Sequence, residues 1–330
     1  MNPDVAQLTE LIKHEGAFIN QVKTEVAKTV IGQADMIEKI LMGLLTGGHV
    51  LLEGLPGLAK TLTIKTVAQA IHVDFNRVQF TPDLLPSDLT GTMIYNQKTG
   101  EFSAKKGPVF TNILLADEIN RAPAKVQAAL LESMGEKQVT IGETSYQLAD
   151  PFLVLATQNP IEQEGTYPLP EAQMDRFMFK VHVGYPNRFE ERKVLEMQST
   201  QRKVEIQPVA SAAQLIKARN ICSAVFMDEK VKDYILDLVF ATREASTKKN
   251  LREIAPYISI GASPRATISL AKGAKAKAFM EGRGFATPDD VKSVATDILR
   301  HRIVMSFEAQ AEEITPPYLI KQLLALVPTP

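Results

Sequence analysis

The stretch Gly54-Leu55-Pro56-Gly57-Leu58-Ala59-Lys60-Thr61 decides the fold. It follows an apolar run at residues 49–52, which is typical of a buried strand, and it precedes helical spacing over residues 61–71. A tight turn between a strand and a helix can direct backbone N–H groups at phosphate oxygens. Because the stretch departs from the pattern G-x-x-x-x-G-K-[ST] only at its last glycine, it predicts a phosphate-binding loop, which we extend to Leu62.

The last residues of this loop have distinct chemical tasks. Lys60 is expected to reach the β- and γ-phosphates, and the hydroxyl of Thr61 is expected to bind Mg²⁺. Ala59 replaces the final glycine of the pattern. We expect this replacement to cost little if the position has helical dihedrals, because only a positive φ penalises a β-carbon.

A second apolar run, Ile113-Leu114-Leu115-Ala116, ends in Asp117 and Glu118. Two acids at the end of a strand are often only a solvated edge. Beside a phosphate loop, the first acid can hold Mg²⁺ and the second can polarise a water for attack on the γ-phosphate. The adjacent glutamate therefore favours hydrolysis over transfer to a small acceptor.

An amide and several arginines complete the candidate set. Asn159, in Ala156-Thr157-Gln158-Asn159-Pro160, could orient the attacking water, or it could initiate a turn as Asn-Pro pairs do. Arg176 and Arg265 could neutralise charge on the transferred phosphoryl group, from the same chain or a neighbour. Taken alone, an arginine at such a position is more often a surface ion-pair partner, and Arg121 is a weaker candidate still.

The order of apolar segments predicts an α/β fold. Helical spacing recurs at residues 8–27, 36–45 and 61–71. Five apolar runs suit buried strands, at residues 49–52, 75–80, 113–116, 152–156 and 177–183. Strands that alternate with helices or turns indicate a mostly parallel sheet covered on both faces. Two segments have the alternation of inserted hairpins, at residues 92–109 and 138–148.

Beyond residue 186 the pattern is helical to the end, so we place a domain boundary near Pro186. Residues 1–186 are predicted to form the α/β core and residues 187–330 a helical domain. Ser263-Pro264 and Thr287-Pro288 have the signature of an N-cap followed by proline at the first helical position.

Composition excludes several classes of protein. The 330 residues suit about two domains, and the single cysteine, Cys222, excludes an internal disulfide and cysteine-cluster metal sites. The chain carries 37 Lys and Arg against 38 Asp and Glu, which argues against a broad nucleic-acid binder. No apolar stretch is long enough to span a bilayer, so we expect a cytoplasmic protein without membrane insertion.

The ordered set of motifs resembles the AAA+ ATPases, and within them the MoxR family. The motifs are the phosphate loop, Leu114-Leu115-Ala116-Asp117-Glu118-Ile119-Asn120-Arg121-Ala122-Pro123, Ala156-Thr157-Gln158-Asn159-Pro160 and Met174-Asp175-Arg176-Phe177. Three more stretches add to the resemblance: Val30-Ile31-Gly32-Gln33, Gln79-Phe80-Thr81-Pro82-Asp83 and Leu299-Arg300-His301-Arg302-Ile303. The resemblance implies a P-loop NTPase (AAA+) core with a parallel five-stranded sheet, a small all-helical lid, and ATP bound between them with Mg²⁺.

The resemblance also implies roles for single residues. It places Val30, Ile31, Gly32 and Gln33 beside the adenine, and Gly54, Leu55, Pro56, Gly57, Leu58, Ala59, Lys60, Thr61 and Leu62 around the phosphates. Thr61 and Asp117 would bind Mg²⁺, Glu118 would activate water, and Asn159 would be the sensor-1 group. Arg176 would be a finger acting on the neighbouring subunit's ATP, and Arg265 the sensor-2 arginine of the lid.

Such a finger implies a ring, usually a hexamer. By resemblance, the function is chaperone-type remodelling, maturation, or cofactor or metal insertion, with a von Willebrand factor A domain partner and a protein client. The two hairpins would face the pore or the partner. The alternatives are a ring ATPase of the metal-chelatase or nucleic-acid-motor type, and an ATP-gated binding switch with little turnover.

Overall fold

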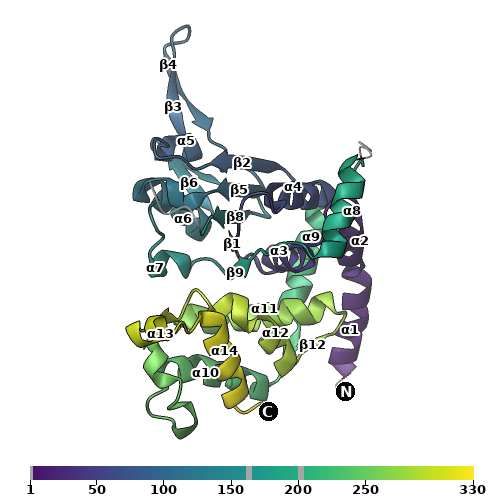
Figure 1. Cartoon of the computed structure of the whole chain (residues 1–330). Coiled ribbons are helices and arrows are strands. Elements are labelled where there is room, and N and C mark those ends of the chain that lie inside the picture. The colour runs from purple at the N-terminus through teal and green to yellow at the C-terminus, as the bar shows by residue number, and fades with distance from the viewer. Residues whose placement is uncertain (1–2, 161–165, 200–203) are drawn as a thin grey trace. The chain divides into compact units, whose positions relative to one another are not determined.

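The computed structural model describes residues 3–160, 166–199 and 204–330, and these form two compact units (Figure 1). The first, which we call the sheet unit, contains Phe18–Leu169 and Val181–Ile216. The second, the helical unit, contains Met1–Ala17, Pro170–Lys180 and Lys217–Pro330. Each unit is therefore assembled from separate parts of the sequence, and the boundary near Pro186 stays a prediction.

The sheet has five strands in the order β2-β5-β8-β1-β9. Their bounds are β1 Val50–Glu53, β2 Phe75–Gln79, β5 Ile113–Asp117, β8 Leu153–Gln158 and β9 Phe179–His182. β1 pairs with β8, β8 with β5, and β5 with β2, all in parallel. Residues of β1, β5 and β8 are almost all buried, as their apolar sequences require. The predicted parallel five-stranded sheet is confirmed.

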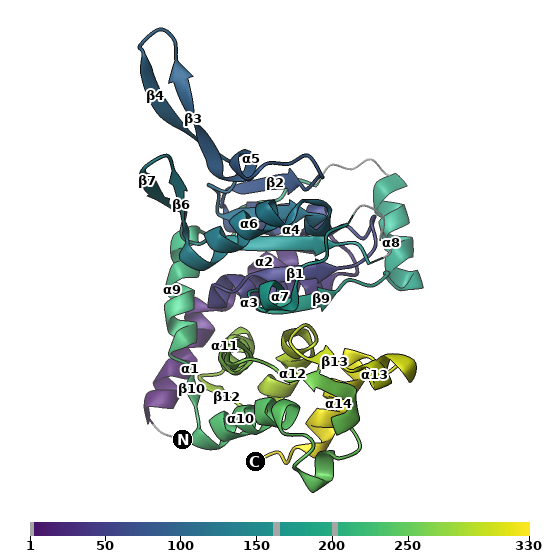
Figure 2. The same cartoon turned by 90° about the vertical axis from the view of Figure 1, so that its left-hand side faces the viewer.

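Helices lie on both faces of the sheet within its unit. Figure 2 shows α3 and α4 on the side away from the viewer and α6 on the near side. The bounds are α2 Ala17–Val26, α3 Ala34–Thr46, α4 Lys60–Ile71, α5 Pro86–Thr90, α6 Ala124–Glu136 and α8 Arg188–Ser199; α9 spans Ala212–Ser223. The helical spacing predicted for residues 8–27 is confirmed, but it belongs to two helices. α1, Pro3–Glu15, ends just before Gly16, because glycine is a poor helix former, and α2 follows it.

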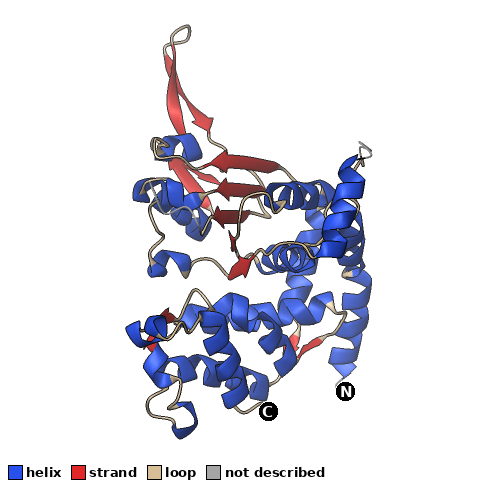
Figure 3. Ribbon diagram, viewed as in Figure 1, coloured by secondary structure: helices blue, strands red, loops and turns tan. Residues whose placement is uncertain are grey.

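Both predicted hairpins are present, and they are separate from the five-stranded sheet (Figure 3). β3, Gly91–Asn96, pairs antiparallel with β4, Glu101–Lys106, and β6, Gln138–Ile141, pairs with β7, Thr144–Gln147. Gly100 and Gly142 have φ of 71° and 62° in the two turns. Glycine adopts such values without strain, which explains why each turn contains one.

The helical unit is built mainly of helices, as predicted. Its elements include α7 Glu171–Met174, α10 Glu229–Arg243, α11 Pro264–Met280, α12 Pro288–Leu299, α13 Phe307–Ala311 and α14 Pro316–Leu326. Two short strand pairs, which the sequence analysis did not predict, join β10 Phe226–Met227 to β12 Phe285–Ala286 and β11 Ile258–Ile260 to β13 Val304–Met305. The Ser263 and Thr287 side chains cap α11 and α12, which confirms both predicted N-caps.

His49 ties β1 to its neighbours in the core of the sheet unit. Its Nε2 lies 3.2 Å from the carbonyl oxygen of Met134, and its Nδ1 accepts a hydrogen bond of 2.9 Å from the Val154 amide. Because Nδ1 accepts, the hydrogen is on Nε2 and the ring is neutral. Burial lowers the pKa of His49 to about 4.

We therefore expect acid to destabilise the protein through His49. Between pH 6.5 and 4 the unfolded state binds a proton that the folded ring does not, so the free energy of unfolding falls as pH falls. Between pH 7 and pH 5, the His49→Gln variant should lose about 2 kcal/mol less than the wild type. Urea unfolding at several pH values measures this, with exposed His182→Gln as control. Equal losses in both variants would contradict the assignment.

Candidate functional site

The phosphate loop lies between the buried strand β1 and the first turn of α4. Gly54 has no room for a side chain, because a Cβ there would come within 2.6 Å of the Val183 carbonyl oxygen. Gly57 has a φ of 85° and faces open space. Since α4 begins at Lys60, its first backbone N–H groups lack partners within the helix. These N–H groups are suited to bind an anion, as the sequence predicts.

Ala59 does not have the helical dihedrals for which its replacement of glycine would cost little. Its φ is 56° and its ψ is 20°, in the left-handed region, immediately before α4. A residue with a β-carbon pays roughly 1–2 kcal/mol there, which glycine does not. The condition for a small cost is therefore not met, and the loop holds a local strain.

The Ala59→Gly variant should be more stable than the wild type. Relief of the left-handed strain should raise the free energy of unfolding by roughly 0.5–1 kcal/mol, after allowance for the greater freedom of glycine in the unfolded chain. Chemical denaturation measures the change. Ala124→Gly, at the exposed first residue of α6, is the matched control and should be destabilising. A loss of stability in Ala59→Gly would contradict the strain.

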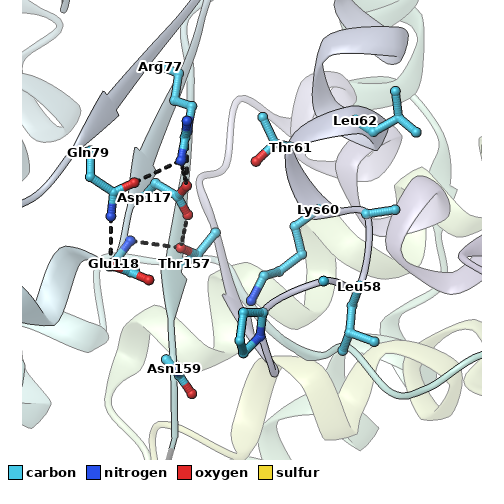
Figure 4. Close-up of a pocket in the computed structure, with 13 residues that line it drawn as sticks. Leu58, Lys60, Thr61, Leu62, Arg77, Gln79, Asp117, Glu118, Thr157 and Asn159 are labelled. Atoms are coloured by element: carbon cyan, nitrogen blue, oxygen red, sulfur yellow. Dashed lines mark hydrogen bonds and ion pairs between the residues drawn. The ribbon is translucent and has the colours of Figure 1, made fainter. Parts of the chain in front are cut away.

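The loop forms one wall of a pocket of about 380 Å³ in the sheet unit. The other walls come from the carboxyl ends of three neighbouring strands, β2, β5 and β8. Its lining residues are Pro56, Gly57, Leu58, Ala59, Lys60, Thr61, Leu62, Arg77, Gln79, Asp117, Glu118, Thr157 and Asn159 (Figure 4). Parallel strands bring their carboxyl ends to the same edge of a sheet, which is why these distant residues meet.

Thr157 links the two acids at the end of β5. Its hydroxyl donates a hydrogen bond of 2.6 Å to Oδ1 of Asp117 and accepts one of 2.8 Å from the Glu118 amide. Glu118 has a φ of 56°, so the chain turns sharply directly after the strand. The buried Thr157 side chain therefore supports this strained turn and orients Asp117.

Two residues of β2 contact the same acids from the other side. Arg77 donates to Oδ2 of Asp117 from Nε at 3.0 Å and from Nη2 at 2.6 Å. Gln79 donates to Oε2 of Glu118 at 2.6 Å, and it accepts a hydrogen bond of 2.8 Å from Arg77. Arg121 Nε is 3.1 Å from the same Glu118 oxygen. Both carboxylates are therefore held by neighbouring side chains of the chain itself.

Arg77, Gln79 and Thr157 were not predicted as site residues, although Gln79 and Thr157 lie in stretches that carry the family resemblance. Arg77 and Gln79 lie two residues apart, so both side chains point to one face of β2. That alternation was the available signal, but by itself it does not show what the two side chains contact. They reach the acids because β2 pairs with β5, with Gln79 in register with Asp117. Thr157 lies in the recognised motif at residues 156–160, two residues before Asn159, and this position was the available signal for it.

Lys60 points toward the strands from the start of α4 (Figure 4). Its Nζ donates a hydrogen bond to the Gly54 carbonyl oxygen. Burial lowers the pKa of Lys60, and the charges of Asp117 and Glu118 partly offset this effect. A partly buried ammonium with few water contacts gains strongly from a bound anion.

A second pocket, of about 510 Å³, also lies in the sheet unit. Val30, Ile31, Gly32 and Gln33 all line it, together with residues at the start of α8, among them Asn187, Phe189, Glu190 and Lys193. The structure thus brings together the four residues predicted to lie beside a base. Gly54 and Leu55 line neither of the two pockets.

Arg176 and Arg265 belong to the helical unit, and both are exposed. Nη1 of Arg265 lies 3.7 Å from Oδ2 of Asp175, the residue before Arg176. The structure therefore brings the two arginines into one local group. Their action on a nucleotide stays a prediction.

The comparisons with known proteins agree with this geometry. Residues 49–179 match the ATPase family associated with various cellular activities (AAA), and residues 252–323 match an AAA lid domain. A crystal structure of an ATPase candidate from Cytophaga hutchinsonii is 51% identical, with a TM-score of 0.93 over 99% of both chains. Fold, loop and acid pair together define an AAA+ ATPase.

Two relatives narrow the assignment. Chaperone MoxR1 of Mycobacterium tuberculosis is 46% identical over 93% of this chain and 81% of its own length. YeaC of Bacillus subtilis is 44% identical over 95% of both chains. The chain belongs to the MoxR family of AAA+ ATPases. Within the residues that the structure describes, no helix has the length and apolar character to cross a membrane.

Proposed function

We propose that this protein hydrolyses ATP in the 380 Å³ pocket and uses the energy to remodel partner proteins. One observation carries the proposal: the phosphate loop, the acid pair and the Asn159 amide converge on a single pocket from α4, β5 and β8. No single strand or helix supplies this set. The convergence supports phosphoryl chemistry over a structural role for the same residues.

Phosphate binding is assigned to the loop, residues 54–62. The free N–H groups at the start of α4 would bind the phosphate oxygens, and the Lys60 ammonium would leave the Gly54 carbonyl to pair with the β- and γ-phosphates. The lowered pKa of Lys60 supports this role, because a poorly solvated cation is stabilised by phosphate charge.

The donor set near the loop fits Mg²⁺. The Asp117 carboxylate and the Thr61 hydroxyl line the same pocket, and Mg²⁺ in proteins typically takes one or two such ligands together with phosphates and waters. Among the described residues, no group of three or more His, Cys, Asp or Glu side chains could hold a metal without such help. When bound, Mg²⁺ would neutralise charge on the phosphates.

Water activation is assigned to Glu118, with Asn159 orienting the water. In the structure Glu118 is held by Gln79 and Arg121. Both contacts are to Oε2, so the carboxylate can accept a proton from water at Oε1 while Gln79 and Arg121 hold its other oxygen. Gln79 is therefore a positioning residue for Glu118, through a hydrogen bond of 2.6 Å.

The adenine is assigned to the second pocket, which Val30, Ile31, Gly32 and Gln33 line. This pocket is mostly apolar in character but carries charged residues of α3 and α8 at its edge, among them Glu38, Glu190 and Lys193. A flat base with polar edges suits such a lining.

The biological role is assigned by similarity. A relative is named a chaperone, which supports remodelling, maturation, or cofactor or metal insertion into client proteins. The finger role of Arg176 requires a ring, for which we propose a homo-hexamer, and we propose a von Willebrand factor A domain protein as partner. A metal-chelatase type, a nucleic-acid motor and an ATP-gated switch with little turnover are the alternatives that the experiments must separate.

The decisive experiment measures phosphate release and ATP binding by the full chain with Mg²⁺. Lys60→Met should weaken ATP binding by about 10–100-fold, since it removes a charge-assisted contact. Lys65→Met, at an exposed position on the same helix, should leave binding unchanged. Wild-type turnover no higher than that of Lys60→Met would contradict hydrolysis and favour the switch. Stimulation by single-stranded DNA would favour the nucleic-acid motor.

A further inference from the structure

Arg302 is a buried arginine in the helical unit that the proposed function does not use. Its side chain is 1% exposed, and it follows α12 in the stretch Leu299-Arg300-His301-Arg302-Ile303. A buried guanidinium is stable only if its N–H groups find acceptors. The acceptors of Arg302 therefore show what this residue holds in place.

Most of these acceptors belong to one short segment, residues 175–178. The guanidinium donates to the carbonyl oxygens of Asp175, Phe177 and Met178 at 3.2, 2.6 and 3.1 Å. Its Nε also donates to Oδ1 of Asp175 at 2.8 Å. In the part of the chain that the structure describes, two further acceptors, on Ile298 and Ser269, lie in helices of the same unit. Arg302 thus attaches residues 175–178, the segment that contains Arg176, to the helices α11 and α12.

His301 strengthens the same attachment. Its Nε2 lies 3.0 Å from the Phe177 carbonyl oxygen, and its ring is buried. Two consecutive side chains of one turn therefore hold the backbone on both sides of the Arg176–Phe177 peptide bond. The segment cannot leave the helices without exposing or orphaning these groups.

Asp175 connects this attachment to the start of α11. Its Oδ1 binds Arg302, while its Oδ2 accepts a hydrogen bond of 2.8 Å from the Ser263 hydroxyl. The same Oδ2 lies 3.7 Å from Nη1 of Arg265. Ser263 is the N-cap of α11. The Asp175 side chain, next to Arg176 in the chain, therefore contacts the N-terminal end of α11, where Arg265 lies.

We propose that Arg302 and Asp175 are positioning residues that make Arg176 and Arg265 parts of one rigid body. A shift of Arg265 toward its nucleotide then moves Arg176 with it. If Arg176 acts on a neighbouring subunit, the nucleotide bound in one subunit determines the position of the Arg176 side chain that this subunit offers to its neighbour. The inference rests on the proposed roles of the two arginines, but the mechanical link can be measured independently of them.

The test uses the full chain in three variants. Arg302→Lys keeps the charge but cannot reach several carbonyls at once, and Asp175→Asn keeps the shape but weakens the pairing with Arg302 and Arg265. Arg283→Lys is the matched control, because Arg283 forms a comparable pair with Asp290 in the same unit without contact to residues 175–178. Hydrogen exchange of the amides of residues 174–177 is followed with and without the non-hydrolysable analogue AMP-PNP, alongside kcat and ATP affinity.

We expect AMP-PNP to change the exchange of these amides in the wild type and in Arg283→Lys, and to leave it unchanged in the other two variants. Basal exchange in those two should be about tenfold faster or more. Their kcat should fall by about tenfold or more with ATP affinity within about twofold, because a small displacement of a charged catalytic group lowers kcat. If Arg302→Lys does not fold, Asp175→Asn alone decides.

The proposal would be overturned if AMP-PNP did not change the hydrogen-exchange rates of the amides of residues 174–177 in the wild type. It would also be overturned by an AMP-PNP response in Asp175→Asn equal to that of the wild type, or by a loss in kcat no greater than in Arg283→Lys. Failure of the finger role is a different result. In that case Arg176→Ala keeps its kcat while the AMP-PNP response of the segment still depends on Asp175 and Arg302.

Discussion

Glu118→Gln is expected to abolish ATP hydrolysis while ATP still binds. The glutamine keeps the size of the side chain and can accept the hydrogen bond from Gln79, so the pocket should retain its shape. It cannot accept a proton from water at neutral pH, and loss of a general base lowers kcat by about 100–10,000-fold. ATP affinity should stay within about twofold, because Glu118 does not bind the phosphates in the proposed mechanism.

The measurement is phosphate release under single turnover, together with ATP binding by calorimetry. Glu132→Gln, at an exposed position on α6, is the matched control and should behave as the wild type. Undiminished turnover in Glu118→Gln would remove Glu118 from the mechanism. The backbone argues for glutamine over glycine in this test, since φ at Glu118 is positive and glycine would relax the turn.

Arg176→Ala is expected to lower kcat by about a thousandfold with ATP binding preserved. An arginine supplied to a phosphoryl-transfer site is worth about 10³–10⁵ in rate, and the proposed finger acts on the ATP of another subunit. Wild-type subunits mixed with an excess of the variant should therefore lose activity, because each lacks a competent neighbour. A residue that acts only within its own subunit would give activity in proportion to the wild-type fraction.

Phosphate release by mixed assemblies, with size-exclusion and light scattering to record the oligomer, checks this expectation. Arg252→Ala removes another exposed arginine of the helical unit and should leave the rate unchanged. Normal hydrolysis by Arg176→Ala in an assembled ring would contradict a finger acting between subunits.

Strong local patterns explain why most of the fold could be predicted. The strands β1, β5 and β8 begin with continuous apolar runs, which are typical of a sheet covered on both faces. The two hairpins have glycine in their turns, and α11 and α12 begin with a cap followed by proline. The break at Gly16 was missed because apolar spacing continues across it, and the strand pairs of the helical unit are too short to give a pattern.

The candidate site divides in the same way. Lys60, Thr61, Asp117, Glu118 and Asn159 were predicted because each has a motif along the chain, and the structure places all five around one pocket. Arg77 has no motif. Its two hydrogen bonds to Asp117 exist because the sheet places β2 beside β5.

The amino-acid sequence alone thus specified the features that adjacent residues form together. These are a turn that offers N–H groups, a strand that ends in two acids, and the caps at the starts of helices. These depend on local backbone geometry, which adjacent residues control. The partners of each charged group required the folded chain, because parallel pairing and burial join residues far apart in sequence. Arg77 with Asp117 and Arg302 with Asp175 are such pairs, and the left-handed φ of Ala59 is strain that the surrounding fold imposes.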